Sequence, residues 1–212
     1  MRKTISFLLI LFTLLASSCS TGTPPPSTPV VVSVYSSSAA EPWLSPLYDC
    51  ARTSAVLSRV DDSSTADIVL QIGEPTALST PAFQIDTEEI LIVTHRQSPI
   101  QNLTLDQAQT LFAQGDPSVQ VWVYASDTDV QSAFDQFVMK GRSALPSARV
   151  AVSPQQMSDT LVNESNAVGI LPRHWKAGDV RDVFSAGTVP VLALTRSEPQ
   201  GVIKELIACL QK

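Results

Sequence analysis

Histidine is scarce in this sequence of 212 residues, which contains only His95 and His174. Neither lies in a spaced set of metal ligands, so we interpret both as surface or loop residues and expect no metal site and no cofactor. Gly-x-Ser-x-Gly, P-loop and Gly-x-Gly-x-x-Gly motifs are also missing. An adjacent carboxylate pair, Asp61 and Asp62, sits in a turn-like stretch, and neighbours on a strand would point to opposite faces. These absences argue against an enzyme.

Basic residues are outnumbered, with 14 Lys and Arg against 20 Asp and Glu, which gives a net charge of −6. A nucleic-acid-binding protein needs a basic footprint, so we expect no nucleic-acid partner. Beyond the first residues, no apolar run approaches the ~18 residues of a membrane-spanning helix. We therefore expect a soluble body.

The first residues have the pattern of an export signal, residues 1–18. Arg2 and Lys3 precede an apolar run from Ile5 to Ala16, which is too short to span ~30 Å of hydrocarbon. Small residues and Cys19 follow, an order that resembles a lipobox with Ala16 where Leu is favoured. We expect Cys19 to be the lipidated first residue of the mature chain. The alternative is an ordinary secretory signal, which would be cut at the same bond.

Residues 19–29 contain Cys19 and then mainly Pro, Ser and Thr. Such a composition cannot bury enough apolar surface to fold, so we expect an extended tether that holds the body off a membrane. A plain disordered terminus is the alternative. With Cys19 lipidated, Cys50 and Cys209 remain as a candidate disulfide pair in an oxidising compartment, or as two buried free thiols.

Strand-like and helix-like patterns alternate from Val30 to the end. Continuous β-branched and apolar runs predict buried strands, for example at residues 30–35 and 90–94. Thr104 and Gln107 have capping-box spacing, and apolar residues with helical periodicity predict helices from Asp129, from Pro154 and near the C-terminus. The alternation predicts an α/β fold with largely parallel sheets.

Several short motifs also occur in a characteristic order. A hydrophobic strand is followed by a Ser-Pro turn, an Asn-Leu-Thr helix start and a helix end at Gly115; a Ser-Ala-Phe helix and an Ala-Val-Gly-Ile strand come later. Upstream lie an Asp-Ile strand start and a triple serine. The motifs occupy residues 36–38, 67–68, 90–94, 98–99, 102–105, 111–115, 132–138 and 167–170. Their order resembles the phosphate-type solute-binding proteins of ABC transporters, in the type 2 periplasmic-binding-protein superfamily, over roughly residues 30–210.

The resemblance implies two α/β lobes with a ligand cleft between them. Lobe 1 would comprise residues 30–95 and 188–212, and lobe 2 residues 96–187. The chain would cross between the lobes near His95 to Pro99 and near Ser185 to Pro190. Cys50 and Cys209 would then both lie in lobe 1, on its first and last helices, which favours their pairing.

The resemblance also directs attention to loops at strand ends, where α/β clefts bind ligands. We expect seven side chains to line the cleft. They are Ser36, Ser37, Ser38, Thr94, Ser126, Thr128 and Asp129. The alternative for the three serines is a polar loop that caps a helix.

One departure from the family pattern bears on the ligand. Phosphate binders carry an Arg-acid-x-Gly-x-Thr loop, whereas this chain has Ala125 or Ser126 in place of the Arg and lacks the glycines. A guanidinium is a major source of oxyanion affinity, and Asp127 and Asp129 oppose binding of a dianion. Phosphate is therefore a possible ligand and not an inferred one.

Two functions follow as hypotheses. The first is a lipoprotein on the extracytoplasmic side of a membrane that binds a small anionic ligand and delivers it to an ABC permease. The second is a sensor or an envelope interaction module that keeps the fold with a degraded cleft.

Overall fold

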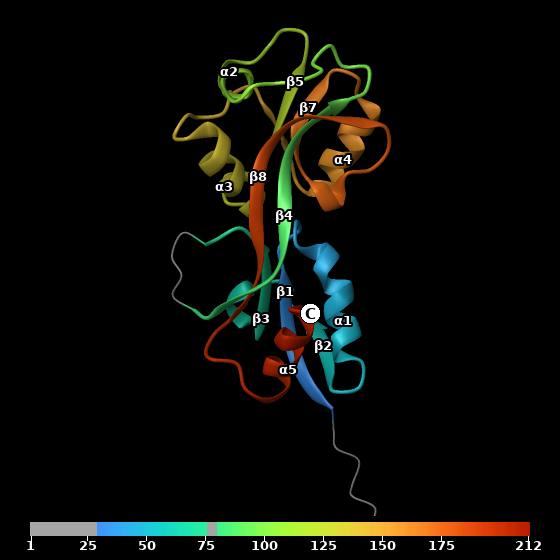
Figure 1. Cartoon of the computed structure of the whole chain (residues 1–212), viewed down its shortest axis with the longest axis vertical. Helices are drawn as coiled ribbons and strands as arrows, with labels where there is room; N and C mark the ends of the chain where they lie inside the picture. Colours follow the sequence, from blue (N-terminus) through green and yellow to red (C-terminus); the bar gives the residue numbers. More distant parts are fainter. Residues whose placement is uncertain (1–28, 76–79) are drawn as a thin grey trace, which may run out of the picture.

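The computed structural model describes residues 29–75 and 80–212. Cys19 and the tether up to residue 28 lie outside these residues. The structure is an elongated α/β body in which two long strands run vertically through both halves (Figure 1). The strands are β1 (Val30–Ser36), β2 (Ala55–Arg59), β3 (Ile68–Ile72), β4 (Ala82–His95), β5 (Gln120–Tyr124), β6 (Arg149–Ala151), β7 (Ala167–Pro172) and β8 (Val180–Thr195).

The strands form a mixed sheet in the order β2-β1-β3-β8-β4-β7-β5-β6. The pairs β1–β2, β1–β3, β5–β6 and β5–β7 are parallel, whereas β3–β8, β4–β8 and β4–β7 are antiparallel. The expectation of largely parallel sheets thus holds for the outer strands only. Antiparallel pairing enters because β8 returns along both β3 and β4.

Helices cover the two ends of this sheet. They are α1 (Leu44–Ala51), α2 (Leu105–Gln114), α3 (Asp129–Phe134), α4 (Pro154–Asn163) and α5 (Gly201–Leu210). The short turns are η1 (Glu41–Trp43), η2 (Ser63–Thr65), η3 (Asp135–Met139) and η4 (Arg173–Trp175). In Figure 1, α1 and α5 flank the lower half and α2, α3 and α4 the upper half, which we call lobe 1 and lobe 2.

The helix ends follow their local sequence. Thr104 and Gln107 form a complete capping box at the start of α2, as predicted. Ser153 caps α4, and Pro154 occupies its first position, where a missing N–H costs nothing. The helix predicted from Asp129 begins there but continues after Phe134 as a π-helical turn that ends at Lys140 in the left-handed conformation.

A disulfide joins Cys50 of α1 to Cys209 of α5, with 6.0 Å between their Cα atoms. The two helices contact each other in lobe 1 (Figure 1). The bridged cysteines are 159 residues apart in the sequence, and the segment between them contains the whole of lobe 2. The disulfide therefore ties the last helix of the chain to the first.

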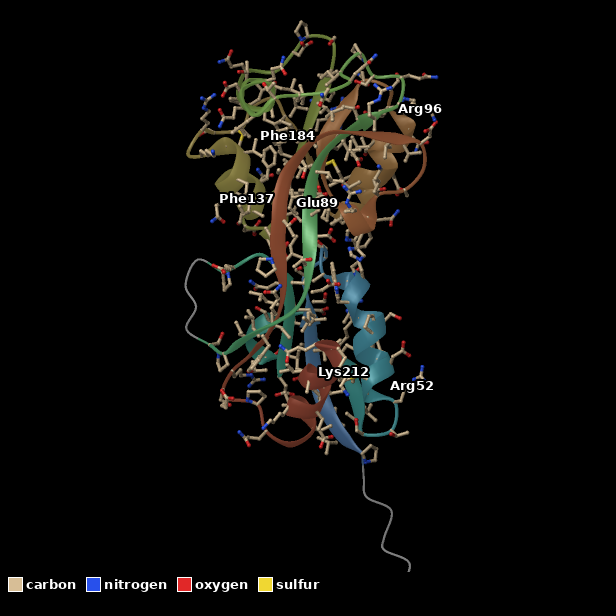
Figure 2. The ribbon with its side chains drawn as sticks, viewed as in Figure 1. Arg52, Glu89, Arg96, Phe137, Phe184 and Lys212 are labelled. Atoms are coloured by element: carbon tan, nitrogen blue, oxygen red, sulfur yellow. A yellow bond between two sulfur atoms is a disulfide. The ribbon has the colours of Figure 1, made fainter. Side chains whose placement is uncertain are left out.

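The two lobes share β4 and β8. Residues Ala82–Leu91 of β4 pair with β8 from Leu194 back to Ser185, and from Ile90 onward β4 also pairs with β7 of lobe 2. The first passage between lobes therefore lies before Ile90, upstream of the expected position near His95. Glu89, near the middle of β4 in Figure 2, accepts hydrogen bonds there from Arg173 Nε at 2.7 Å and Ser185 Oγ at 2.6 Å.

Candidate functional site

The site lies where the loop after β1 meets the loop before α3. Ser37 follows the last residue of β1, and its backbone N–H donates to Leu70 O of β3 at 2.9 Å. Its hydroxyl accepts a hydrogen bond from the Ala40 N–H at 3.2 Å. Because that contact uses an acceptor lone pair, the hydroxyl proton is free to point away from the loop, toward lobe 2.

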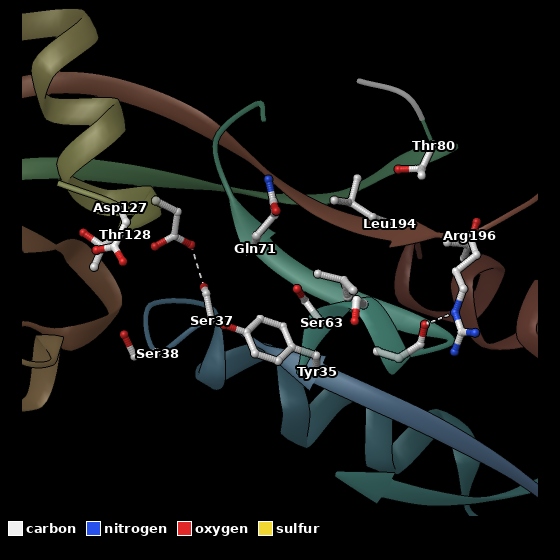
Figure 3. Close-up of a pocket in the computed structure, with 15 residues that line it drawn as sticks. Tyr35, Ser37, Ser38, Ser63, Gln71, Thr80, Asp127, Thr128, Leu194 and Arg196 are labelled. Carbon is white, nitrogen blue, oxygen red and sulfur yellow. Dashed lines mark hydrogen bonds between the residues drawn. The ribbon is translucent and has the colours of Figure 1, made fainter. Parts of the chain in front are cut away.

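Asp129 of lobe 2 accepts the hydrogen bond that this hydroxyl donates. Its Oδ2 accepts from Ser37 Oγ at 2.5 Å and from the backbone N–H of Ile72 at 3.0 Å. The last β1–β3 pair is Ser36 with Leu70, so Ile72 lies beyond the end of β1 and its N–H is left for another acceptor. Figure 3 shows the Ser37 hydrogen bond as a dashed line across the space between the lobes.

The other oxygen of Asp129 is held within lobe 2, because Oδ1 accepts from the Val130 N–H at 2.9 Å. Burial raises the pKa of this carboxyl above its ordinary value, and this outweighs the lowering by the hydrogen bonds from Ser37, Ile72 and Val130. The carboxylate is therefore well supplied with donors but poorly solvated.

Two cavities open on either side of Asp129. The first has a volume of about 530 Å³ and extends over lobe 1 between Tyr35, Val69 and Leu194 to Arg196 (Figure 3). The second has a volume of about 400 Å³ and reaches Pro75, Phe137 and Pro190. Gln71, Asp127 and Asp129 line both, so these three residues form the wall between the cavities.

The charge of the two cavities is mainly negative. Asp127 and Asp129 line both, and Glu74 lines the second. Among the described residues that line these two cavities, Arg196 is the only basic one. It is at the far end of the first cavity, where it donates to the carbonyl oxygens of Ala66 and Thr65 and lies 3.5 Å from an oxygen of Asp67. Its charge is thus already engaged.

Of the seven side chains predicted to line the cleft, four line the first cavity. They are Ser37, Ser38, Thr128 and Asp129. Ser36 is buried beside it and donates to Ser37 O at 2.9 Å. Thr128 caps α3 by accepting from the Gln131 N–H.

Thr94 and Ser126 belong to neither of the two cavities. Thr94 is fully buried near the end of β4 in lobe 2, where it pairs with Val168 and Arg181. Ser126 is exposed in the loop before α3 and is absent from both linings. Thr94 lies near the end of β4, away from the loop after β1, whereas Ser126 lies in the same loop as Thr128 and Asp129 but does not line either cavity.

Sequence reasoning did not select Gln71, Ile72 or Arg196. Ile72 acts through its backbone N–H, which no side-chain pattern reveals. Gln71 is a polar residue inside an otherwise apolar strand, and this was a signal that could have been used. Arg196 directly follows the last residue of β8, a strand-end position like those of the predicted residues.

A second contact holds the same loop to lobe 2. Trp175 Nε1 of η4 donates to Ala39 O at 3.0 Å, two residues after Ser37. Beside it the His174 ring lies 4.6 Å from the Trp43 ring, centroid to centroid. The loop after β1 is therefore hydrogen-bonded to two separate elements of lobe 2, α3 and η4.

Neither a metal centre nor a spanning helix is found in the described residues. Within residues 29–75 and 80–212, no group of three His, Cys, Asp or Glu side chains is arranged to hold a metal ion. No helix in the same ranges has the length and apolar character needed to cross a membrane.

Comparisons by sequence give no relative: no family model and no curated protein matches the chain. Solved structures do match. An ABC-type phosphate transport receptor from Vibrio cholerae superposes with a TM-score of 0.65 at 17% identity, over 85% of this chain and 93% of that one. A candidate phosphate ABC transporter substrate-binding protein with bound phosphate, from Clostridium perfringens, gives 0.74 at 15% identity, over 85% and 92%.

Regulatory domains match as well. A variant of the OxyR2 regulatory domain from Vibrio vulnificus gives a TM-score of 0.64 at 9% identity, over 86% of this chain and 97% of that one. At such identities the likeness concerns the fold. The chain has the two-lobed fold of periplasmic-binding-protein-like domains, which transport receptors and regulatory domains share.

Proposed function

We propose that this protein is a membrane-anchored solute-binding lipoprotein of an ABC transporter that binds a small anion between its lobes. One observation carries the proposal: Ser37 Oγ and the Ile72 N–H converge on one carboxylate oxygen across the space between the lobes. Donors that hold a carboxylate can hold an oxygen of an anionic solute in the same way. Two of the similar structures are phosphate transport proteins by name, which supports an anion.

The charges around the site favour a solute of low charge. The family's Arg is missing, and Glu74, Asp127 and Asp129 surround the donors. A dianion such as phosphate at neutral pH would meet repulsion without a guanidinium to offset it. A monoanion fits this environment better, and phosphate remains one of the solutes to test.

The tether supports the transport role. A receptor must stay near its permease, and acyl chains on Cys19 followed by a Pro-rich segment would keep it there. Solute capture would proceed by closure of the lobes, with β4 and β8 as the connection that bends.

Thermal unfolding in the presence of phosphate, sulfate, molybdate, formate, acetate and lactate tests the proposal. A bound solute at about 100-fold its Kd adds about 2.7 kcal/mol of stability. We expect one of these anions to stabilise the protein, Ser37→Ala to weaken its binding, and Ser126→Ala, outside both cavities, to bind it normally. If none shifts the melting temperature, the protein does not bind these solutes.

A sensor or envelope interaction module is the second candidate. It is favoured by the similarity to regulatory domains and by Asp129, whose carboxylate already uses the donors that a solute needs. Permease and ATPase genes beside this one would support transport. Their absence, together with a failed solute screen, would support the second candidate.

A further inference from the structure

Asp129 is placed as a ligand would be. It belongs to lobe 2, yet its Oδ2 takes one hydrogen bond from the loop after β1 and one from the end of β3, both in lobe 1. Its side chain also lies in the wall between the two cavities. The carboxylate thus both joins the lobes and divides the space between them.

Lobe 1 supplies the hydrogen bonds and the strand pairing that orient the two donors. The Ser37 hydroxyl is oriented by the Ala40 N–H, and the Ser37 backbone is fixed by Leu70 O. The Ile72 N–H is directed by the pairing of β3 with β8. If Asp129 withdrew, these donors would stay in place without a partner, and unpaired donors away from water are costly.

Asp129 is also a displaceable occupant. Its hydrogen bonds come from a hydroxyl and from backbone amides, and none of the described residues gives it a salt bridge. Asp127 lines both cavities as a further negative charge. A partly buried carboxylate without a cation is poorly compensated, so an external anion can compete for the same donors.

We infer that Asp129 is a tethered substitute for the solute: its carboxylate fills the anion subsite formed by Ser37 Oγ and the Ile72 N–H and holds the lobes together while no solute is bound. The subsite takes a single carboxylate-type oxygen, so the matching solute is a small monocarboxylate. When Asp129 swings out, the wall between the two cavities opens and leaves room for the rest of the solute. This inference deepens the proposed function, on which it rests in naming the solute class, whereas the bridge by Asp129 stands independently of it.

The test removes the Asp129 carboxylate by substitution and then asks whether an added carboxylate binds in its place. In Asp129→Ala, made in the full chain, the Ile72 amide loses its acceptor. We expect faster hydrogen exchange in the peptide that contains Ile72, and expect formate or acetate to restore protection in a saturable way. The melting temperature of Asp129→Ala should also rise when formate or acetate is added, by about 5–10 °C at about 100-fold excess over Kd. Asp127→Ala is the matched control, because Asp127 lines the same cavities without bridging the lobes.

Three results would overturn the inference: unchanged exchange at Ile72 in Asp129→Ala, no saturable response of that variant to formate or acetate, or an equal response in Asp127→Ala. If Asp129→Ala does not fold, Asp129→Asn serves instead. Its neutral side chain is a weaker acceptor, so formate should bind it more tightly than it binds the wild type, and equal affinity would contradict the inference. If no solute in the screen stabilises the wild type against thermal unfolding, the proposed function is refuted, whereas the bridge by Asp129 is not.

Discussion

The Nδ1 atom of His174 lies 2.8 Å from Oε2 of Glu88, a side chain that is only 1% exposed. Glu88 sits in β4 where that strand passes between the lobes, and its other oxygen accepts from the Glu89 N–H at 2.9 Å. His174 belongs to η4, and the next residue of the same element, Trp175, donates to Ala39 O. The pair therefore fastens η4 to the strand that connects the lobes.

His174→Ala should destabilise the protein, because it leaves one oxygen of the buried Glu88 side chain without its partner. Loss of a partner for a buried polar group costs about 1–3 kcal/mol. Urea unfolding at neutral pH measures the change. His95→Ala is the control. The His95 ring, at the end of β4, accepts an exposed hydrogen bond from the Gln97 N–H, so its loss should change stability by less than about 0.5 kcal/mol. Equal effects of both variants would contradict this role for His174.

The Cys50–Cys209 bridge should contribute substantially to stability, because it restricts the unfolded chain over a long loop. The chain-entropy model gives about 4–5 kcal/mol for a loop of this size, and measured values often fall lower. Urea unfolding of Cys50→Ser/Cys209→Ser against the wild type tests the magnitude. Non-reducing mass spectrometry of the mature protein provides the check: two free thiols would rule the bridge out.

Asp129 should make stability depend on pH in a defined direction. Burial raises the pKa of this carboxyl in the folded state above its value in the unfolded chain. The folded state therefore binds the proton more readily, and the wild type gains stability relative to Asp129→Asn as pH falls through the folded pKa. That gain is complete below the unfolded pKa and is lost again as pH rises through the folded one.

Urea unfolding of the wild type and Asp129→Asn between about pH 7 and pH 3 measures this difference. Asp127→Asn serves as the control, with Asp127 exposed in the same loop. A difference between wild type and Asp129→Asn that moves in the opposite direction with acidification would show that the folded-state pKa is lowered instead.

Cys19→Ala should release the protein from the membrane, since stable anchoring requires the acyl chains that Cys19 would carry. Fractionation of cells expressing wild type and variant shows the outcome. Ser18→Thr, with the cysteine kept, is a control for changes in processing. A Cys19→Ala protein that stays in the membrane fraction at the wild-type level would refute the anchor.

Local chemistry made much of the fold predictable. The capping box of Thr104 and Gln107 and the proline at the start of α4 depend on neighbours in the chain, and the structure has both. The first half of β4 and of β8 was not predicted. The first half of β4 pairs with the second half of β8, and the first half of β8 pairs with the second half of β4. Both segments carry polar residues, such as Asp86 and Asp182, so continuous apolar runs do not mark them.

The site was predictable only in part, for a similar reason. Ser37 and Asp129 were selected because each lies in a loop region after a strand, but 92 residues separate them, and their contact depends on the order of strands in the sheet. Thr94 met a similar criterion and lies in the core of lobe 2. Local sequence shows that a residue is at a strand end, whereas only long-range pairing decides which strand ends meet.

The shared strands also constrain how the lobes can move. β4 and β8 remain paired from lobe 1 into lobe 2, with register irregularities between Gln84 and Asp86 and between Ile90 and Leu91, on either side of the passage. Such irregularities increase local twist and bending. Because two paired strands connect the lobes, we expect the connection to bend rather than rotate freely. The strand pairing would then return the lobes to one preferred angle after each bending motion.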